Sequence, residues 1–227
     1  MRGNGVARRL RRARGNARGF TLIEAAMATV IIGVGVVAVI DAQRAFVQAN
    51  LWSSQAATAT LLANEIRELT RNLPRHDPVT GLSRGTDIDG NDVLIGWGPE
   101  PGEVIATDFD DLDDFDGLSF GMGGDLPGPI NAVGNVIPEI DLDGEIEVDG
   151  DGDVLPMQGW TQSVTVWKVS PFNTGVALAD NEFEAPSGGF RGRRVDEYPL
   201  RVEVTVFYQG LQDDEPTEVT RVAWIVP

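Results

Sequence analysis

The first long pattern in the chain is an apolar run followed by an amphipathic one. Residues 20–40 contain a single charged side chain, Glu24, and at about 1.5 Å per residue such a run is long enough to cross a bilayer as a helix. Apolar side chains then recur every three or four positions over residues 59–73, until Pro74 interrupts the pattern. We therefore expect one long helix over residues 20–73, with residues 20–40 as its transmembrane part.

The C-terminal third of the chain changes to a period of two. Residues 162–169 and 200–208 alternate polar and apolar side chains, and residues 217–226 continue in the same way. The polar connection over residues 209–216 is long enough for a hairpin, so the last two strands should pair antiparallel. The sequence predicts an α+β fold, in which the long N-terminal helix packs on a C-terminal antiparallel β-sheet over residues 159–227.

The segment between helix and sheet, residues 74–158, is acidic and rich in glycine and proline. From Asp77 to Asp153 it carries 21 acidic residues and one basic residue, Arg84. Such a composition indicates exposed loops. Together with the predicted sheet, this segment would form a head domain over residues 74–227.

The last acidic cluster of this segment is a candidate metal site. Closely spaced carboxylates separated by glycines suit calcium, which takes six to eight oxygen ligands. The helix-loop-helix calcium pattern is not met, because counting from Glu147 its twelfth position is Gln158. Two interpretations stay open, a structural Ca²⁺ site and a solvated acidic loop, and no other cofactor is required. The candidate ligands are Asp141, Asp143, Glu145, Asp149, Asp151 and Asp153.

Charge is distributed very unevenly along the chain. Residues 1–19 contain seven arginines and no acid, which leaves 18 − 7 = 11 basic residues against 35 acidic ones in the remainder. By the positive-inside rule, this asymmetry predicts a cytoplasmic N-terminus and an extracytoplasmic head. The formal net charge of −17 also gives no support to nucleic-acid binding.

The junction between the basic segment and the apolar run contains a specific motif. The hexapeptide at residues 19–24, Gly-Phe-Thr-Leu-Ile-Glu, resembles the prepilin signal of type IV pilins and type II secretion pseudopilins. This resemblance implies that prepilin peptidase removes residues 1–19 by cutting between Gly19 and Phe20 and methylates the new amine of Phe20. It also implies that Glu24 pairs with the N-terminal ammonium of a neighbouring subunit during filament assembly.

The resemblance implies a structural subunit of a type IV pilus or type II secretion pseudopilus. Its partners would be prepilin peptidase, other pilin or pseudopilin subunits and the inner membrane, where it would sit as a single-pass protein before assembly. The helix end over residues 61–74 resembles that of minor subunits, so we expect a minor pilin or pseudopilin.

Two other classes of function are alternatives to the filament subunit. A membrane-anchored extracytoplasmic binding module would keep residues 1–40 as an uncleaved anchor and bind Ca²⁺ or a basic ligand through its acidic head. An enzyme is not expected, because the chain has no cysteine, one histidine (His76) and no serine nucleophile motif.

Overall fold

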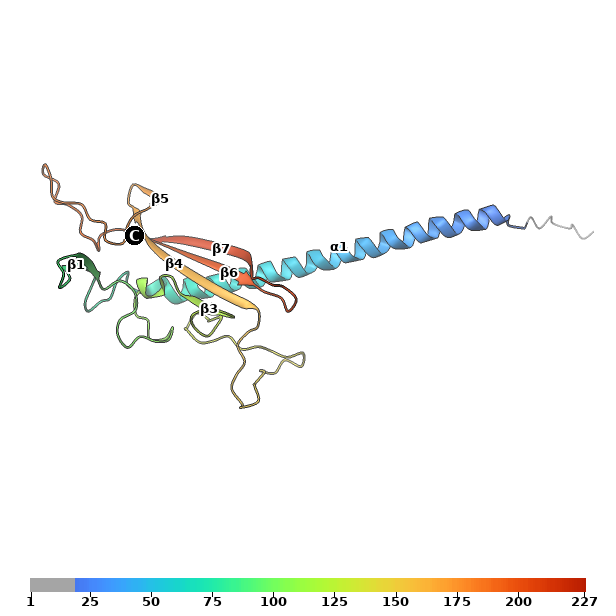
Figure 1. The fold of residues 1–227 in the computed structure, drawn as a ribbon, viewed down its shortest axis with the longest axis horizontal. Coiled ribbons are helices and arrows are strands. Elements are labelled where there is room, and N and C mark those ends of the chain that lie inside the picture. Colours follow the sequence, from blue (N-terminus) through green and yellow to red (C-terminus); the bar gives the residue numbers. More distant parts are fainter. Residues whose placement is uncertain (1–18) are drawn as a thin grey trace, which may run out of the picture. The chain divides into compact units, whose positions relative to one another are not determined.

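The computed structural model describes residues 19–227, and residues 1–18 of the predicted leader lie outside the described residues. The chain divides into two units, Met1–Asn50 and Leu51–Pro227. Helix α1 (Leu22–Leu69) has residues in both units and is followed by a single 3₁₀ turn, η1 (Thr70–Asn72) (Figure 1).

The two parts of α1 differ in burial. All of its residues in the N-terminal unit are exposed, whereas four small or aliphatic side chains near its C-terminal end are almost fully buried. They lie at the predicted helical spacing, so the amphipathic stripe is confirmed. Full burial of a leucine or isoleucine stabilises the fold by about 1.5–3 kcal/mol. The four buried residues are Ala59, Leu62, Ala63 and Ile66.

The main sheet has five antiparallel strands. Its order is β3-β4-β6-β7, with β5 paired to the end of β4. The two C-terminal strands start and end at the predicted residues and form the predicted antiparallel pair. The strands are β3 (Ser119–Gly121), β4 (Trp160–Ser170), β5 (Asn173–Ala177), β6 (Leu200–Tyr208) and β7 (Thr217–Val226).

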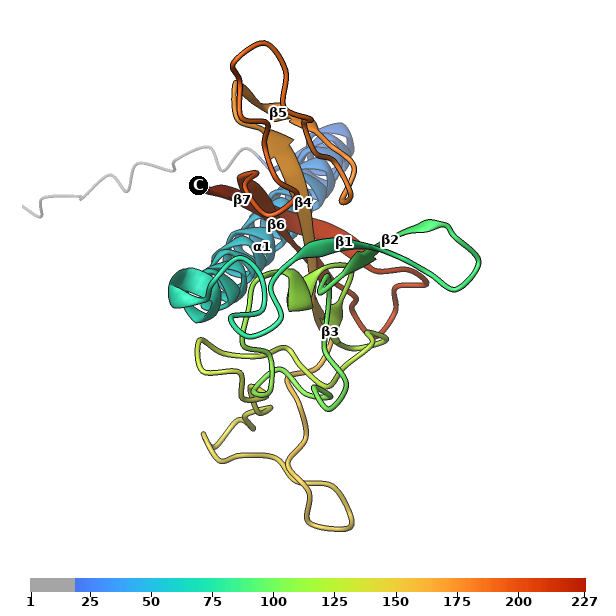
Figure 2. The same ribbon diagram turned by 90° about the vertical axis from the view of Figure 1, so that its left-hand side faces the viewer.

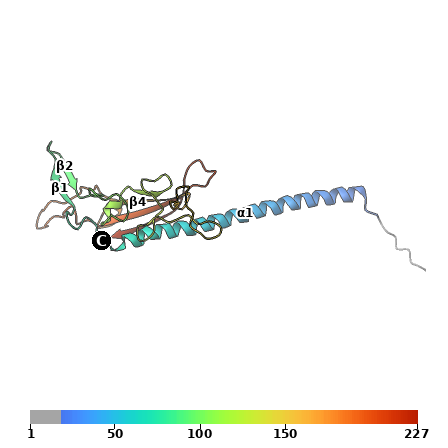
Figure 3. The ribbon, with the colours of Figure 1, turned by 90° about the horizontal axis from the view of Figure 1, so that it is seen from below.

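The core lies between the C-terminal part of α1 and one face of this sheet. Val202, Val204 and Val206 of β6 are fully buried in one cluster with Leu62 and Ile66 of the helix. Figure 3 shows the sheet running alongside this part of α1. The predicted fold class is confirmed: a long N-terminal helix packs on an antiparallel sheet, as in pilins.

The acidic middle segment is less exposed than its composition suggests. It contains a two-stranded hairpin, β1 (Ser83–Thr86) with β2 (Asp92–Ile95), and a 3₁₀ turn, η2 (Asp113–Phe115). The expectation that the whole segment is exposed is wrong for residues 106–130, because aromatic and aliphatic side chains there enter the core. The buried side chains are Ala106, Phe109, Leu112, Phe115, Phe120 and Ile130.

One five-residue turn recurs four times in this segment. Each copy begins with Asp or Asn, whose Oδ1 accepts hydrogen bonds from the backbone N–H groups two and four residues later. Each has glycine at its fourth position with φ between 80° and 91°, a conformation that other residues rarely adopt. Figure 2 shows the loop around residue 150 extending away from the sheet. The turns are residues 87–91, 131–135, 141–145 and 149–153.

Candidate functional site

The predicted processing site lies at the start of α1. Phe20 is 84% exposed, and no neighbouring atom lies within 4 Å of the position where Gly19 would carry a Cβ. Both residues precede the first helical residue, Leu22. The peptide bond between Gly19 and Phe20 is therefore sterically open on the described chain.

Glu24 is held by a local hydrogen-bond network that the sequence analysis missed. Its Oε2 accepts hydrogen bonds from the backbone N–H and the hydroxyl of Thr21, each at 3.0 Å, and the N–H of Glu24 donates to Thr21 Oγ1 at 3.3 Å. This arrangement is a capping box, whose signal, Thr followed three residues later by Glu, is present in the sequence. Glu24 thus stabilises the first turn of α1 in the isolated chain.

The apolar surface around Glu24 is uncovered. The large apolar side chains of residues 22–40 are 42–91% exposed. Of the described helices, α1 with its 3₁₀ extension is long and apolar enough to cross a membrane. Apolar surface of this extent requires lipid or other protein as its environment.

The six predicted calcium ligands belong to two of the repeated turns. Asp141 and Asp149 each use Oδ1 to accept two backbone N–H groups, and the hydrogen bonds to Asp149 lower the pKa of its carboxyl. All six residues are at least partly exposed. Within residues 19–227, the groups of three carboxylates close enough to share an ion lie elsewhere. The calcium site at residues 141–153 stays a prediction.

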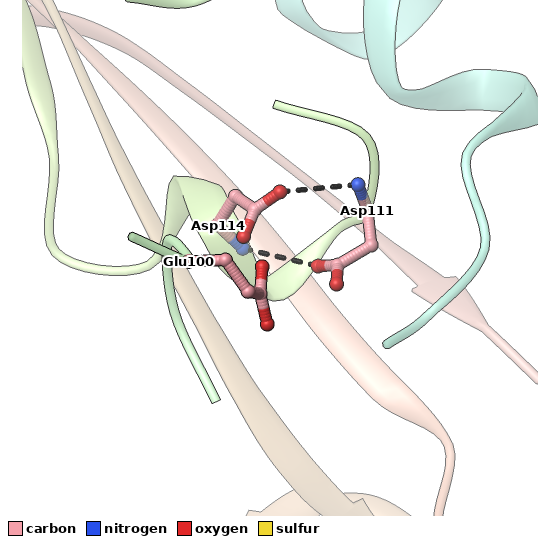
Figure 4. A group of neighbouring side chains, drawn as sticks. All are labelled: Glu100, Asp111 and Asp114. Atoms are coloured by element: carbon pink, nitrogen blue, oxygen red, sulfur yellow. Dashed lines mark hydrogen bonds between the residues drawn. The ribbon is translucent and has the colours of Figure 1, made fainter. Parts of the chain in front are cut away.

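A second acidic group lies in the buried part of the middle segment. Asp111 and Asp114 are fully buried, and each offers a carboxylate oxygen within 4.8 Å of one from Glu100 (Figure 4). Burial raises the pKa of Asp111 to about 9, that of Glu100 to about 7 and that of Asp114 to about 6. Their mutual repulsion adds to this effect. The acidic run 108–116 was visible in the sequence, but nothing there indicated its burial.

His76, the single histidine, is part of the same buried region. Its Nδ1 lies 2.5 Å from Asp113 Oδ2, and the side chain is 7% exposed. Burial lowers the pKa of His76 to about 4 and raises that of Asp113 to about 7, so the surroundings favour the neutral form of each group. This pair connects the segment after α1 to η2.

Comparison with known proteins gives one match. The family model of the prokaryotic N-terminal methylation motif matches residues 14–40, which include the hexapeptide and the apolar run after it. No curated protein and no solved structure matched the chain.

The matched motif covers Gly19, Phe20 and Glu24, whose geometry is described above. It supports a pilin- or pseudopilin-like subunit and indicates a structural protein rather than an enzyme. It also implies processing by prepilin peptidase and assembly with other pilin subunits in a membrane context, and the apolar helix fits a single-pass inner-membrane protein. The chain thus carries a type IV pilin-like prepilin signal at the start of a pilin-like α+β fold.

Proposed function

We propose that this protein is a minor subunit of a type IV pilus or type II secretion pseudopilus. It is made as a precursor in the inner membrane, cut between Gly19 and Phe20, methylated on the new amine and then taken into a filament. The observation that carries the proposal is the methylation motif on a helix whose apolar surface is uncovered over residues 22–40.

Glu24 has a specific role in this proposal. A carboxylate in the bilayer costs about 2.5–3.5 kcal/mol at the centre and less near the interface, so its presence favours an opposite charge nearby. The amine of Phe20 on a neighbouring subunit supplies that charge. The capping hydrogen bonds from Thr21 go to Oε2. Because Glu24 of one subunit would pair with the amine of Phe20 on the next, this contact would fix the axial register of one helix against its neighbour.

The surface just beyond the predicted span favours a filament over a lone anchored module. Phe46 is 68% exposed and Val47 is 55% exposed, although both follow residue 40 and so lie past the predicted transmembrane part. A monomeric anchor would leave these side chains in water. Neighbouring helices of a filament would cover them and so remove this apolar surface from water.

The orientation follows from charge. The arginines of residues 1–19 would remain in the cytoplasm, and the acidic head would be extracytoplasmic, as the positive-inside rule requires. Prepilin peptidase then meets the Gly19–Phe20 bond at the cytoplasmic side of the membrane. The minor-subunit assignment rests on the resemblance of residues 61–74 to the helix ends of minor subunits.

The test is the intact mass and N-terminal sequence of the protein purified from its native membrane. We expect a chain of residues 20–227 carrying one methyl group on the amine of Phe20. A Gly19→Val variant should keep the precursor mass, whereas the control Gly15→Val, which alters a glycine elsewhere in the leader, should be processed normally. A wild-type chain that begins at Met1, or one cut near Ala38, would refute the proposal and favour the anchored binding module.

A further inference from the structure

Five acidic residues of the middle segment gather at one place in the C-terminal unit. Carboxylate oxygens of Glu100, Asp111 and Asp114 lie within 4.8 Å of one another, and the same holds for Glu103, Asp110 and Asp114. The two groups share Asp114. Asp111 and Asp114 are fully buried, whereas Asp110 is exposed, so the cluster extends from the interior to the surface.

The two buried aspartates each use one oxygen for the backbone. Asp111 Oδ1 accepts hydrogen bonds from the N–H groups of Asp113 and Asp114, at 2.9 and 3.2 Å. Asp114 Oδ2 accepts from the N–H groups of Asp110 and Asp111, both at 3.1 Å. These bonds fix both carboxyl groups in orientation, as Figure 4 shows for the two that join Asp111 and Asp114.

The remaining oxygens have no partner within the described chain. Asp111 Oδ2, Asp114 Oδ1 and Glu100 Oε2 are buried and accept no hydrogen bond from residues 19–227. The ion pairs within residues 19–227 all involve other acids, so Glu100, Asp111 and Asp114 have no cationic side chain as a partner in this part of the chain. Buried polar atoms in native proteins are nearly always paired, because an unpaired one loses its hydration without compensation. Three such oxygens from three neighbouring acids favour a cation as their partner.

The chemistry of the donors indicates which ligand this is. All are carboxylate oxygens, which hard divalent cations prefer over nitrogen and sulfur ligands. Calcium binds oxygen at about 2.3–2.6 Å, so two ligands on opposite sides of the ion lie about 4.8 Å apart. The spacing of the cluster is compatible with one such ion.

We propose that Glu100, Asp111 and Asp114 bind a hard divalent cation, for which calcium is the probe, with Glu103 and Asp110 on its exposed side. The ion would fasten residues 100–114 to the core, because Leu112 and Phe115 beside the ligands are fully buried there. The site stabilises the fold and does not depend on the proposed filament function. It is also separate from the predicted ligands at residues 141–153.

The test measures the melting temperature (Tm) of the full-length protein in detergent micelles by near-UV circular dichroism, with 10 mM calcium chloride and with EDTA. For dissociation constants of about 0.1–1 mM, typical of extracellular calcium sites, mass action predicts that calcium raises the Tm by about 3–10 °C. The double variant Asp111→Asn and Asp114→Asn should lose this rise, because asparagine keeps the oxygen that accepts the backbone bonds but removes the charge. Its Tm in EDTA should equal or exceed that of the wild type, since the repulsion is relieved.

The matched control is the double variant Asp141→Asn and Asp149→Asn, which removes the first acid of two exposed turns and should keep the full calcium response. Glu100→Gln, at the partly buried edge of the cluster, is the second variant in case the first fails to fold, and it should reduce the rise at least by half. The proposal is overturned if calcium does not change the Tm of the wild type, or if the response is lost in the control and kept in the variants of Glu100, Asp111 and Asp114.

Discussion

Gln162 is the polar side chain that connects three parts of the core, and its replacement gives a sharp stability test. It is fully buried in β4. Its Nε2 donates to the carbonyl oxygens of Leu62 in α1 and Ile130 in the middle segment, at 2.8 and 3.0 Å, and its Oε1 accepts from the N–H of Ile130 at 2.8 Å. Gln162→Leu keeps a similar volume and removes all three bonds.

The magnitude follows from the groups left behind. The N–H and the carbonyl of Ile130 would both be buried without a partner, at about 1–3 kcal/mol each, so the free energy of unfolding should fall by about 4 kcal/mol. The carbonyl of Leu62 adds less, because a helical carbonyl at this position can still accept its intrahelical bond. For a domain of this size the loss corresponds to a Tm fall of about 8–16 °C.

The assay is thermal unfolding of the full-length protein in detergent, followed by near-UV circular dichroism. Thr165→Val is the matched control: it lies in the same strand on the exposed side, and its effect should stay within about 0.5 kcal/mol. The smallest expected fall is about 4 °C, from two unpaired groups at about 1 kcal/mol each. If Gln162→Leu melts within about 2 °C of the wild type, the hydrogen-bond argument fails.

Three further predictions concern the helix start, a glycine in the sheet and the acidic cluster. Glu24→Gln should insert in the membrane but fail to enter filaments, because glutamine preserves the capping box and loses the charge. Thr21→Ala should still assemble, because it weakens the cap by about 1 kcal/mol and keeps the charge of Glu24. Fractionation of sheared fibres measures both outcomes. Gly121→Ala should lower the free energy of unfolding, measured by chemical denaturation, by more than about 3 kcal/mol, because φ is +129° and the new Cβ would lie 2.1 Å from the carbonyl oxygen of Trp160. The control Gly123→Ala, with φ +73° and no atom within 4 Å of the new Cβ, should lower it by about 1 kcal/mol. In EDTA the Tm should fall as pH rises from about 5 to 8. Burial holds the pKa values of Glu100, Asp111 and Asp114 above those of the unfolded chain, so the unfolded state releases its protons at lower pH than the folded state does. The double variant Asp111→Asn and Asp114→Asn should show a flatter dependence of Tm on pH.

The parts of the fold that the sequence predicted well are those with a long, regular period. Such periods occur in the helix over 20–73 and in the strands over 200–208 and 217–226, each over eight or more residues. A regular spacing of apolar residues identifies the type of element without knowledge of distant contacts. Strand β4 was predicted as 162–169, and its ends at Trp160 and Ser170 were missed. Gln162 and Lys168 are also fully buried although both are polar, which the alternation of the strand did not indicate.

The middle segment was predicted poorly because its signals are not periodic. Phe109, Leu112 and Phe115 stand singly among acids, so their burial depends on contacts with α1 and the sheet that are distant in sequence. Aspartate is among the residues least often fully buried, and the burial of Asp111 and Asp114 therefore had no local signal. The repeated turns are the opposite case: the pattern of Asp or Asn with glycine three residues later was present, and its interpretation as metal ligands competed with its simpler role in turns.

The N-terminal part of α1 needs partners that the C-terminal part already has within its own chain. Ala59, Leu62 and Ile66 are covered by the sheet, so the C-terminal unit has a closed core of its own. Residues 22–50 of α1 are exposed in the isolated chain, and those past residue 40 include large apolar side chains beyond the predicted transmembrane part. A helix of this kind is stable in water only when other helices bury that surface. The chain therefore favours lipid around residues 20–40 and neighbouring protein around the apolar residues just beyond them, which agrees with the proposed filament.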